Sequence, residues 1–246
     1  MSLPIAVQLY TLREEMEKDF VGILEKVSNL GYQGVEFAGF GELEAEELKG
    51  HLDRLDLRAV GSHTAIDLLR NKLDEVIEYN LTIENPYIVV PYADYDGKED
   101  FIEMANELSE IATVLKEKGL TLCYHNHAHE FERYDGEYGL DLIYSNVAPE
   151  LLKVELDTYW VKKAGLDPAA YLSKYSGRVP LVHLKDMEAE TGDFAEVGEG
   201  VININEIIEA AEEADSEWLV VEQDKCKRPA LESVEISINN LKDLLI

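Results

Sequence analysis

Short apolar runs alternate along the chain with longer segments in which apolar residues recur every three or four positions. The short runs are typical of buried strands, and the helical spacing is typical of amphipathic helices. The predicted strands lie at residues 5–10, 34–37, 57–63, 87–92, 119–125, 152–157, 178–186 and 217–224. The predicted helices lie at residues 19–30, 44–55, 66–79, 99–118, 140–147, 168–175, 204–214 and 231–245. The pattern therefore predicts repeated strand–helix units along the whole sequence.

Strands that alternate with helices pair in parallel through right-handed crossovers, and eight units in 246 residues match a closed (β/α)8 barrel. The runs IVV, LVV and PLVH are apolar throughout, which indicates strands buried on both faces. No GxGxxG motif follows the first strand, so an open doubly wound sheet is the less favoured alternative. We expect an α/β fold with a single TIM barrel domain over residues 1–246.

The amino-acid composition is typical of a soluble protein. The chain is 46% hydrophobic, and no apolar run reaches the roughly 18 residues that a membrane span needs. Its first residues, MSLPIAVQLY, lack the basic and apolar regions of a signal peptide. Two cysteines, Cys123 and Cys226, make no disulfide framework. These features predict a cytoplasmic protein.

The net charge of the chain limits the classes of binding partner that we expect. The chain has 51 acidic against 22 basic residues, a formal charge of −29. Such a charge repels phosphate backbones and anionic lipid surfaces, so we expect neither a nucleic acid nor a membrane as partner. The sequence leaves the oligomeric state open.

Three metal-type side chains close consecutive predicted strands: Asp157 in LLKVELD, His183 in VPLVHLKD and Glu222 in EWLVVEQD. Because the carboxyl ends of barrel strands meet at one face, we expect these side chains at one site. The preceding run, GLTLCYHNHAHE, adds His125, His127, His129 and Glu130. Carboxylate oxygen together with imidazole nitrogen suits a divalent ion such as Mn, Co, Zn or Mg.

Further polar residues at strand ends are candidates for catalysis. Glu36 ends the second strand, and burial near other carboxylates would raise its pKa towards that of a general base. His127 is a second candidate acid or base. Lys185 shares strand parity with His183, so its ammonium is expected to face the same site and stabilise an oxyanion. The alternative for Lys185 is an ion pair with Asp186 or Glu222.

Substrate contacts are expected from Gln8 and His63, which end the first and third strands, and from Trp160, whose ring can stack on a sugar. We find no glycine-rich anion cradle and few arginines at strand ends. An unphosphorylated polyol is therefore the expected ligand.

The runs GYQGVEF, YHNHAHEF, LDTYW, VHLKD, VGEG and VVEQD, in this order along eight units, resemble the xylose isomerase-like barrels. That group includes sugar phosphate isomerases and epimerases, ketose 3-epimerases, inosose dehydratases and abasic-site endonucleases. The resemblance implies one Mn, Mg, Co or Zn ion held by Glu, Asp, His and Glu from strands five to eight. Asp157, His183 and Glu222 match the last three of these ligands. His125 stands in place of the fifth-strand glutamate, and Glu130 is the alternative fourth ligand.

The resemblance implies an enzyme, a divalent-metal-dependent sugar isomerase or epimerase that acts on a keto-sugar or related polyol through an enediolate. One alternative is a lyase on the same barrel, either inosose dehydratase-like or acting on a keto-glycoside. A second alternative is a non-catalytic sugar-binding barrel. Trp160 stands where 3-epimerases have a histidine, so epimerisation at that carbon is not implied by this position. The negative charge argues against an endonuclease.

Overall fold

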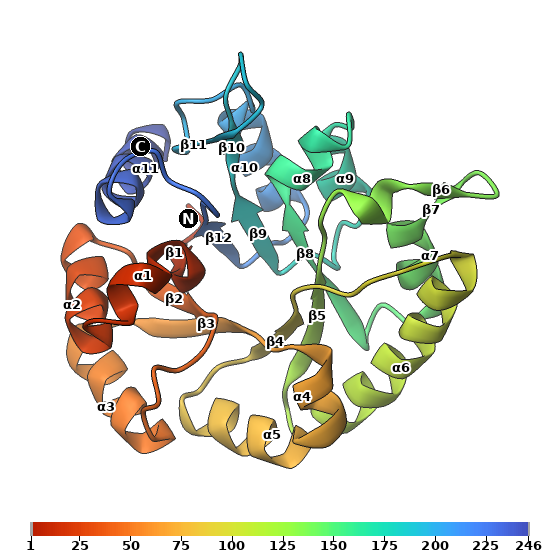
Figure 1. The fold of residues 1–246 in the computed structure, drawn as a ribbon, viewed down its shortest axis with the longest axis horizontal. Coiled ribbons are helices and arrows are strands. Elements are labelled where there is room, and N and C mark those ends of the chain that lie inside the picture. The colour runs from red at the N-terminus through yellow and green to blue at the C-terminus, as the bar shows by residue number, and fades with distance from the viewer. Residues whose placement is uncertain (1, 246) are drawn as a thin grey trace.

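The computed structural model describes residues 2–245 and contains a closed parallel barrel. Around the barrel the strands follow the order β1-β12-β9-β8-β5-β4-β3-β2 (Figure 1). They are β1 (Ile5–Gln8), β2 (Gly34–Phe37), β3 (Arg58–His63), β4 (Tyr87–Val90), β5 (Thr121–His125), β8 (Leu152–Asp157), β9 (Leu181–Leu184) and β12 (Trp218–Val221). The predicted fold class, an α/β TIM barrel, is confirmed.

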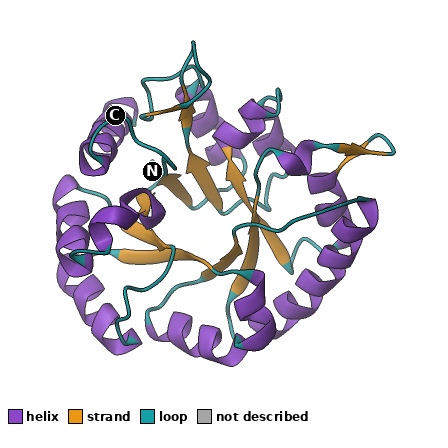
Figure 2. Ribbon diagram, in the orientation of Figure 1, coloured by secondary structure: helices purple, strands orange, loops and turns teal. Residues whose placement is uncertain are grey.

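Helices surround the barrel as an outer ring (Figure 2). They are α1 (Arg13–Met16), α2 (Phe20–Leu30), α3 (Ala45–Leu55), α4 (Ile66–Asn71), α5 (Leu73–Thr82), α6 (Lys98–Glu117), α7 (Gly139–Asn146), α8 (Thr158–Lys163), α9 (Pro168–Lys174), α10 (Ile204–Glu213) and α11 (Ala230–Leu244). The single helix predicted over residues 66–79 is wrong, because the backbone of Lys72 leaves the helical region (φ −141°, ψ 31°) and separates α4 from α5. None of the helices described here is long and apolar enough to cross a membrane.

Four strands end earlier than the sequence predicts, and one of them is β4, which stops at Val90. β1 stops at Gln8, because its side chain accepts a hydrogen bond from Tyr10 N and caps a 3-10 turn, η1 (Leu9–Leu12). β9 and β12 stop at Leu184 and Val221. Lys185 and Glu222 therefore lie just beyond their strands, where the chain turns over the mouth of the barrel.

The interior of the barrel is built in layers. Its lower layer is an apolar cluster of eight buried residues: Ala6, Val60, Tyr87, Val89, Cys123, Leu181, Trp218 and Val220. Side chains alternate along a strand, so the next inward positions on β5 and β9 and just beyond β12 are His125, His183 and Glu222. A polar layer thus lies directly on an apolar one, towards the carboxyl ends of the strands.

Asp186 organises the long loop that follows β9. It begins β10 (Asp186–Met187), which pairs with β11 (Phe194–Ala195) in a short antiparallel sheet. Its carboxylate accepts hydrogen bonds from the backbone N–H groups of Met187 (2.7 Å), Gly198 (3.0 Å), Gly200 (2.9 Å) and Ile202 (3.0 Å). The VHLKD and VGEG runs are therefore tied to one another through a single side chain.

Candidate metal centre

Four side chains converge at the carboxyl ends of the strands and form what we call the outer group: His125, Asp157, His183 and Glu222. Each offers one ligand atom, these atoms all lie within 4.8 Å of one another, and all four residues are buried. His125 Nε2 lies 3.6 Å from Asp157 Oδ2, and His183 Nδ1 lies 2.8 Å from Glu222 Oε2. The structure thus brings together the four residues predicted to bind metal.

Glu130, the alternative fourth ligand, lies elsewhere. Its carboxylate accepts hydrogen bonds from the Tyr124 hydroxyl and from His127 N, both at 2.8 Å. Neither group of potential metal ligands found among residues 2–245 includes it. Glu130 lies within the 3-10 turn η2 (His129–Phe131), and its side chain instead fixes the backbone of the HNHAHEF run.

Asp157 is held by the start of α8. Its Oδ1 accepts a hydrogen bond from Trp160 N at 3.0 Å and so caps the helix. Its Oδ2 is buried without a hydrogen-bond partner in the described chain, although Lys185 Nζ lies 3.0 Å away. Burial raises the pKa of Asp157 to about 6. One oxygen is therefore fixed by the backbone, and the other is left facing the outer group.

Lys185 places a positive charge beside the outer group, as its strand parity predicts. Its Nζ lies 2.8 Å from Glu222 Oε2 and 2.8 Å from Asp224 Oδ1. Burial alone would lower the pKa of this amine, but the carboxylates of Asp157 and Glu222 raise it well above its ordinary value. Lys185 is therefore an ammonium, and it pairs with Glu222 and not with Asp186.

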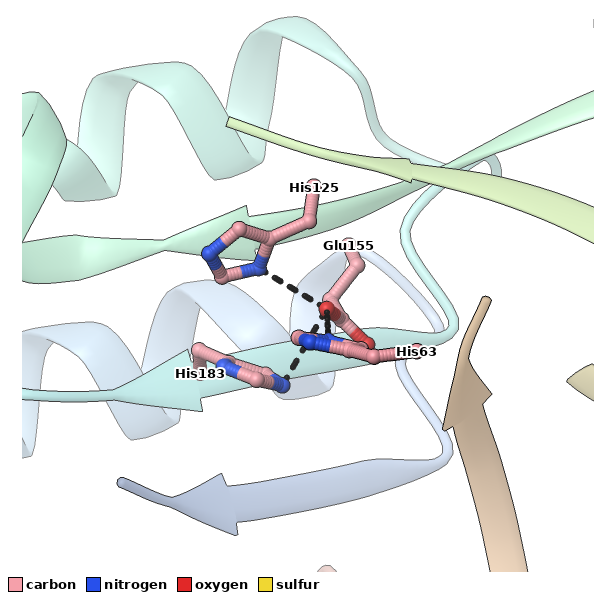
Figure 3. A group of neighbouring side chains, drawn as sticks. All are labelled: His63, His125, Glu155 and His183. Atoms are coloured by element: carbon pink, nitrogen blue, oxygen red, sulfur yellow. Dashed lines mark hydrogen bonds and ion pairs between the residues drawn. The ribbon is translucent and has the colours of Figure 1, made fainter. Parts of the chain in front are cut away.

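A second cluster, which we call the inner group, contains His63, His125, Glu155 and His183 (Figure 3). Glu155 Oε2 is its centre and lies 2.7 Å from His63 Nε2, 2.8 Å from His125 Nδ1 and 3.2 Å from His183 Nε2. The sequence analysis missed Glu155. The signal was present in LKVELD, because Glu155 precedes Asp157 by two residues and so has the same inward parity.

Glu36 and Gln8 lie beside the inner group, and both are fully buried. Gln8 Nε2 donates a hydrogen bond to Glu36 Oε2 at 2.8 Å, and the same oxygen lies 2.6 Å from His183 Nε2. Burial, followed by the nearby Glu155 carboxylate, raises the pKa of Glu36 to about 7. The structure thus places both residues behind His183, away from the cavity described next.

A cavity of about 500 Å³ opens onto the outer group. Its walls include His63, His125, His127, Lys185 and Glu222. A pocket of this volume is in the range of small-molecule sites and can hold a monosaccharide. Two members of the outer group, His125 and Glu222, are therefore in contact with the space that a substrate would fill.

His127 and Trp160 lie together near this cavity, with ring centroids 5.2 Å apart. His127 also packs edge-on against Tyr92, a cavity residue, at 5.4 Å. Burial lowers the pKa of His127 to about 3, so its imidazole is neutral. His127 Nδ1 and Trp160 Nε1 are both buried without a hydrogen-bond partner in the part of the chain described. Two polar atoms are thus left free near the cavity.

Comparisons with known proteins agree with this geometry. Residues 24–244 match the model of the xylose isomerase-like TIM barrel family, and the chain belongs to that family. An inosose dehydratase from Clostridium beijerinckii is 26% identical over 149 residues, which cover 53% of this chain and 49% of that protein. The chain spans about half the length of the curated relatives it matches.

Solved structures share the fold over the whole chain. A sugar phosphate isomerase/epimerase from Parabacteroides distasonis superposes with a TM-score of 0.87 at 23% identity, covering 100% of this chain and 96% of that one. The IolI protein with a bound zinc atom superposes with a TM-score of 0.76 at 14% identity, covering 100% and 98%. At these identities the likeness shows the barrel fold alone.

Proposed function

We propose that this protein is a divalent-metal-dependent sugar isomerase or epimerase that acts on a keto-sugar or related polyol through an enediolate. The observation that carries the proposal is the outer group, a set of four buried ligand-type side chains, two of which, His125 and Glu222, line a cavity of monosaccharide size. Family membership supports an enzyme of this broad kind. The combination of metal-ligand side chains with an adjacent cavity distinguishes the outer group from the other polar clusters of the barrel.

The charges at the site fit a bound cation. Five carboxylates, from Glu36, Glu155, Asp157, Glu222 and Asp224, lie against the ammonium of Lys185 and the imidazoles. Uncompensated buried charge is costly, so the excess negative charge favours a divalent ion or protonated imidazoles. Asp157 Oδ2 supports the first of these, because it faces the outer group and Lys185 Nζ is its one recognised polar neighbour among residues 2–245 apart from His125 Nε2. The zinc in the IolI structure is a further support.

His125, Asp157, His183 and Glu222 would hold one Mn, Mg, Co or Zn ion, since oxygen and imidazole ligands suit these metals. When bound, the ion supplies positive charge to substrate oxygens and so stabilises an enediolate. His125 is the fourth ligand in this proposal, because Glu130 bonds within its own loop.

Lys185 and His127 are the residues to which we assign proton and charge handling. The Lys185 ammonium reaches the cavity and can donate a hydrogen bond to an oxyanion that develops on the substrate. His127 is a neutral imidazole that lines the cavity and can hold a substrate hydroxyl, and it would accept a proton only if its pKa, lowered to about 3 by burial, rose when substrate binds. Glu36 is fully buried and bonded to Gln8 and His183, a position that suits support of His183 better than contact with substrate.

Substrate recognition is assigned to His63, which lines the cavity, and to Trp160, which lies beside His127. We do not assign Gln8 to substrate binding, because its amide oxygen accepts a hydrogen bond from Tyr10 N and its amide nitrogen donates one to Glu36. Arg13, another cavity residue, donates to the carbonyls of Tyr10 (2.8 Å) and Asp224 (3.0 Å). Arg13 is thus engaged, and the sequence offers no glycine-rich anion cradle, so we retain an unphosphorylated substrate as the expected one.

A second candidate function is dehydration of an inosose. The curated relatives of the chain are named inosose dehydratases, which is the observation in its favour. Loss of water beside a carbonyl begins with the same proton removal, so the same residues would serve.

Product analysis separates the alternatives. The Mn²⁺-loaded or Co²⁺-loaded protein is incubated with a panel of ketoses and inososes, and the products are identified by mass spectrometry and NMR. Conversion at constant mass supports an isomerase or epimerase, whereas loss of the elements of water supports a dehydratase. Saturable sugar binding without any conversion would favour a sugar-binding barrel and contradict the proposal.

A further inference from the structure

The outer and inner groups share two imidazoles, and they use opposite nitrogens of each ring. His125 presents Nε2 to Asp157 in the outer group and Nδ1 to Glu155 in the inner group. His183 presents Nδ1 to Glu222 and Nε2 to the inner carboxylates. Both rings are buried, so their orientation is set by these contacts and by packing.

A neutral imidazole has one nitrogen that carries hydrogen and one that carries a lone pair. If His125 and His183 give their lone pairs to an ion in the outer group, both inner nitrogens carry hydrogens. Those hydrogens need acceptors inside a dry barrel, because an unpaired buried donor is costly. Glu155 of the inner group is the acceptor for His125, and Glu36, which lies beside that group, and Glu155 are the acceptors for His183.

We infer that Glu155 is a positioning residue, a carboxylate that fixes the tautomer and ring orientation of His125 and, together with Glu36, those of His183, so that both rings serve the outer group. This inference rests on the proposed metal site. Glu155 Oε2 lies within hydrogen-bond distance of His125 Nδ1, at 2.8 Å, and of His63 Nε2, at 2.7 Å. Carboxylates that receive the second N–H of a ligating histidine typically raise metal affinity about 10- to 100-fold.

The apolar layer below makes a buried acid at position 155 unexpected. Residues such as Cys123, Leu181 and Val220 fill the adjacent interior, as is usual in barrels, and an apolar side chain would continue that layer at no electrostatic cost. Glu155 is instead fully buried, and its Oε1 lacks a hydrogen-bond partner within residues 2–245. The role in orienting two ligands accounts for keeping the charge there.

Glu155→Gln tests the inference, since it preserves size but replaces a pure acceptor by a group that also donates. Zn²⁺ and Co²⁺ affinities are measured by competition with a chelating dye, and histidine tautomers are measured by long-range ¹H–¹⁵N NMR of the zinc-loaded protein. We expect one ion per wild-type chain, His125 protonated at Nδ1 and His183 at Nε2. In Glu155→Gln we expect about 10- to 100-fold weaker binding and a disturbed His125 tautomer.

Two further variants serve as controls for this experiment. Glu155→Asp keeps the carboxylate but withdraws it by one methylene, and its affinity should lie between those of the wild type and Glu155→Gln. Glu130→Gln is the matched control, because Glu130 is equally buried but belongs to neither group, and its affinity should stay within about twofold of the wild type.

Three results overturn the inference in distinguishable ways. Unchanged affinity and tautomers in Glu155→Gln would show that Glu155 does not position the ligands. A second ion in the wild type that Glu155→Gln abolishes would make Glu155 a direct ligand. A wild-type protein that binds no Zn²⁺ or Co²⁺ would contradict the proposed function, and the positioning role with it.

Discussion

Gly61 on β3 faces Glu36 on β2, and the space that a side chain would need at Gly61 is filled by the Glu36 carboxylate. A Cβ atom built at Gly61 would lie 2.2 Å from Glu36 Oε1. The two residues are paired in the parallel register of β2 and β3, at a point where that register shifts. The glycine therefore makes room for a buried acid that touches His183.

This relationship predicts that Gly61→Ala destabilises the fold by about 1–3 kcal/mol, because the added methyl group overpacks the barrel interior. Urea unfolding measures the change in the free energy of unfolding. Most of the loss should disappear in a Glu36→Ala background, where the clash is removed. Gly50→Ala is the control, since a Cβ at this position in α3 meets nothing within 4 Å and should stabilise by up to about 1 kcal/mol. Equal effects at both glycines would contradict the packing argument.

Asp157→Ala and Glu222→Ala are each expected to lose the bound ion, because each removes a carboxylate ligand of the outer group. Trp160→Ala should retain the ion and weaken substrate binding, since the ring lies near the cavity without belonging to the group. Elemental analysis of the purified variants measures the metal content. Full metal in both acid variants would show that the outer group is not the binding site.

Metal affinity should fall as the solution becomes more acidic. Burial raises the pKa of Asp157 to about 6, so below that pH its carboxyl group is protonated in the metal-free protein and must release the proton before it can ligate. His183 also starts protonated: burial lowers its pKa, but the Glu155 and Glu36 carboxylates raise it well above its ordinary value. The apparent metal affinity should therefore rise with pH over the whole range from pH 5 to 8. Below about pH 6 the rise should be steeper, by up to a further tenfold in affinity per pH unit, because Asp157 must also release a proton. Titrations with Zn²⁺ from pH 5 to 8 would refute this if the affinity did not change.

Asp186 is expected to act on stability and not on metal affinity directly, because its carboxylate accepts four backbone hydrogen bonds in the loop after β9. Asp186→Ala should lower the free energy of unfolding by at least about 2 kcal/mol, since hydrogen bonds to a charged acceptor are strong and the donors would be left unpaired. Asp193→Asn is the control, because the Asp193 side chain is 62% exposed. A loss no larger than that of Asp193→Asn would mean that the loop is held by other contacts.

Much of the fold is predictable from the sequence, because buried parallel strands and amphipathic helices differ in the spacing of their apolar residues. The exact strand ends are less predictable. β1 ends at Gln8 because of a side-chain bond to Tyr10 N, and nothing in the run IAVQLY marks that bond. A local hydrogen bond can thus end a strand within an unbroken apolar pattern.

The candidate site is predictable at the level of which residues end the strands, as for Asp157, His183 and Glu222. What the sequence does not reveal is the depth of each side chain inside the barrel. Gln8 and Glu36 lie at strand ends, yet both are hidden behind His183. Glu155 is not among the predicted site residues, because it lies inside the strand and not at its end, although the parity of LKVELD points it inward with Asp157.

Metal-dependent enediolate chemistry is tested by deuterium exchange from heavy water into ketoses and inososes, catalysed by protein whose metal content has been determined. We expect stoichiometric metal and incorporation of deuterium beside the carbonyl. Exchange should stop when a chelator removes the ion, return when Mn²⁺ or Co²⁺ is restored, and be absent in Asp157→Ala. Exchange that persists at full rate in the stripped protein, or a fully metal-loaded protein that exchanges none of these substrates, would contradict this expectation.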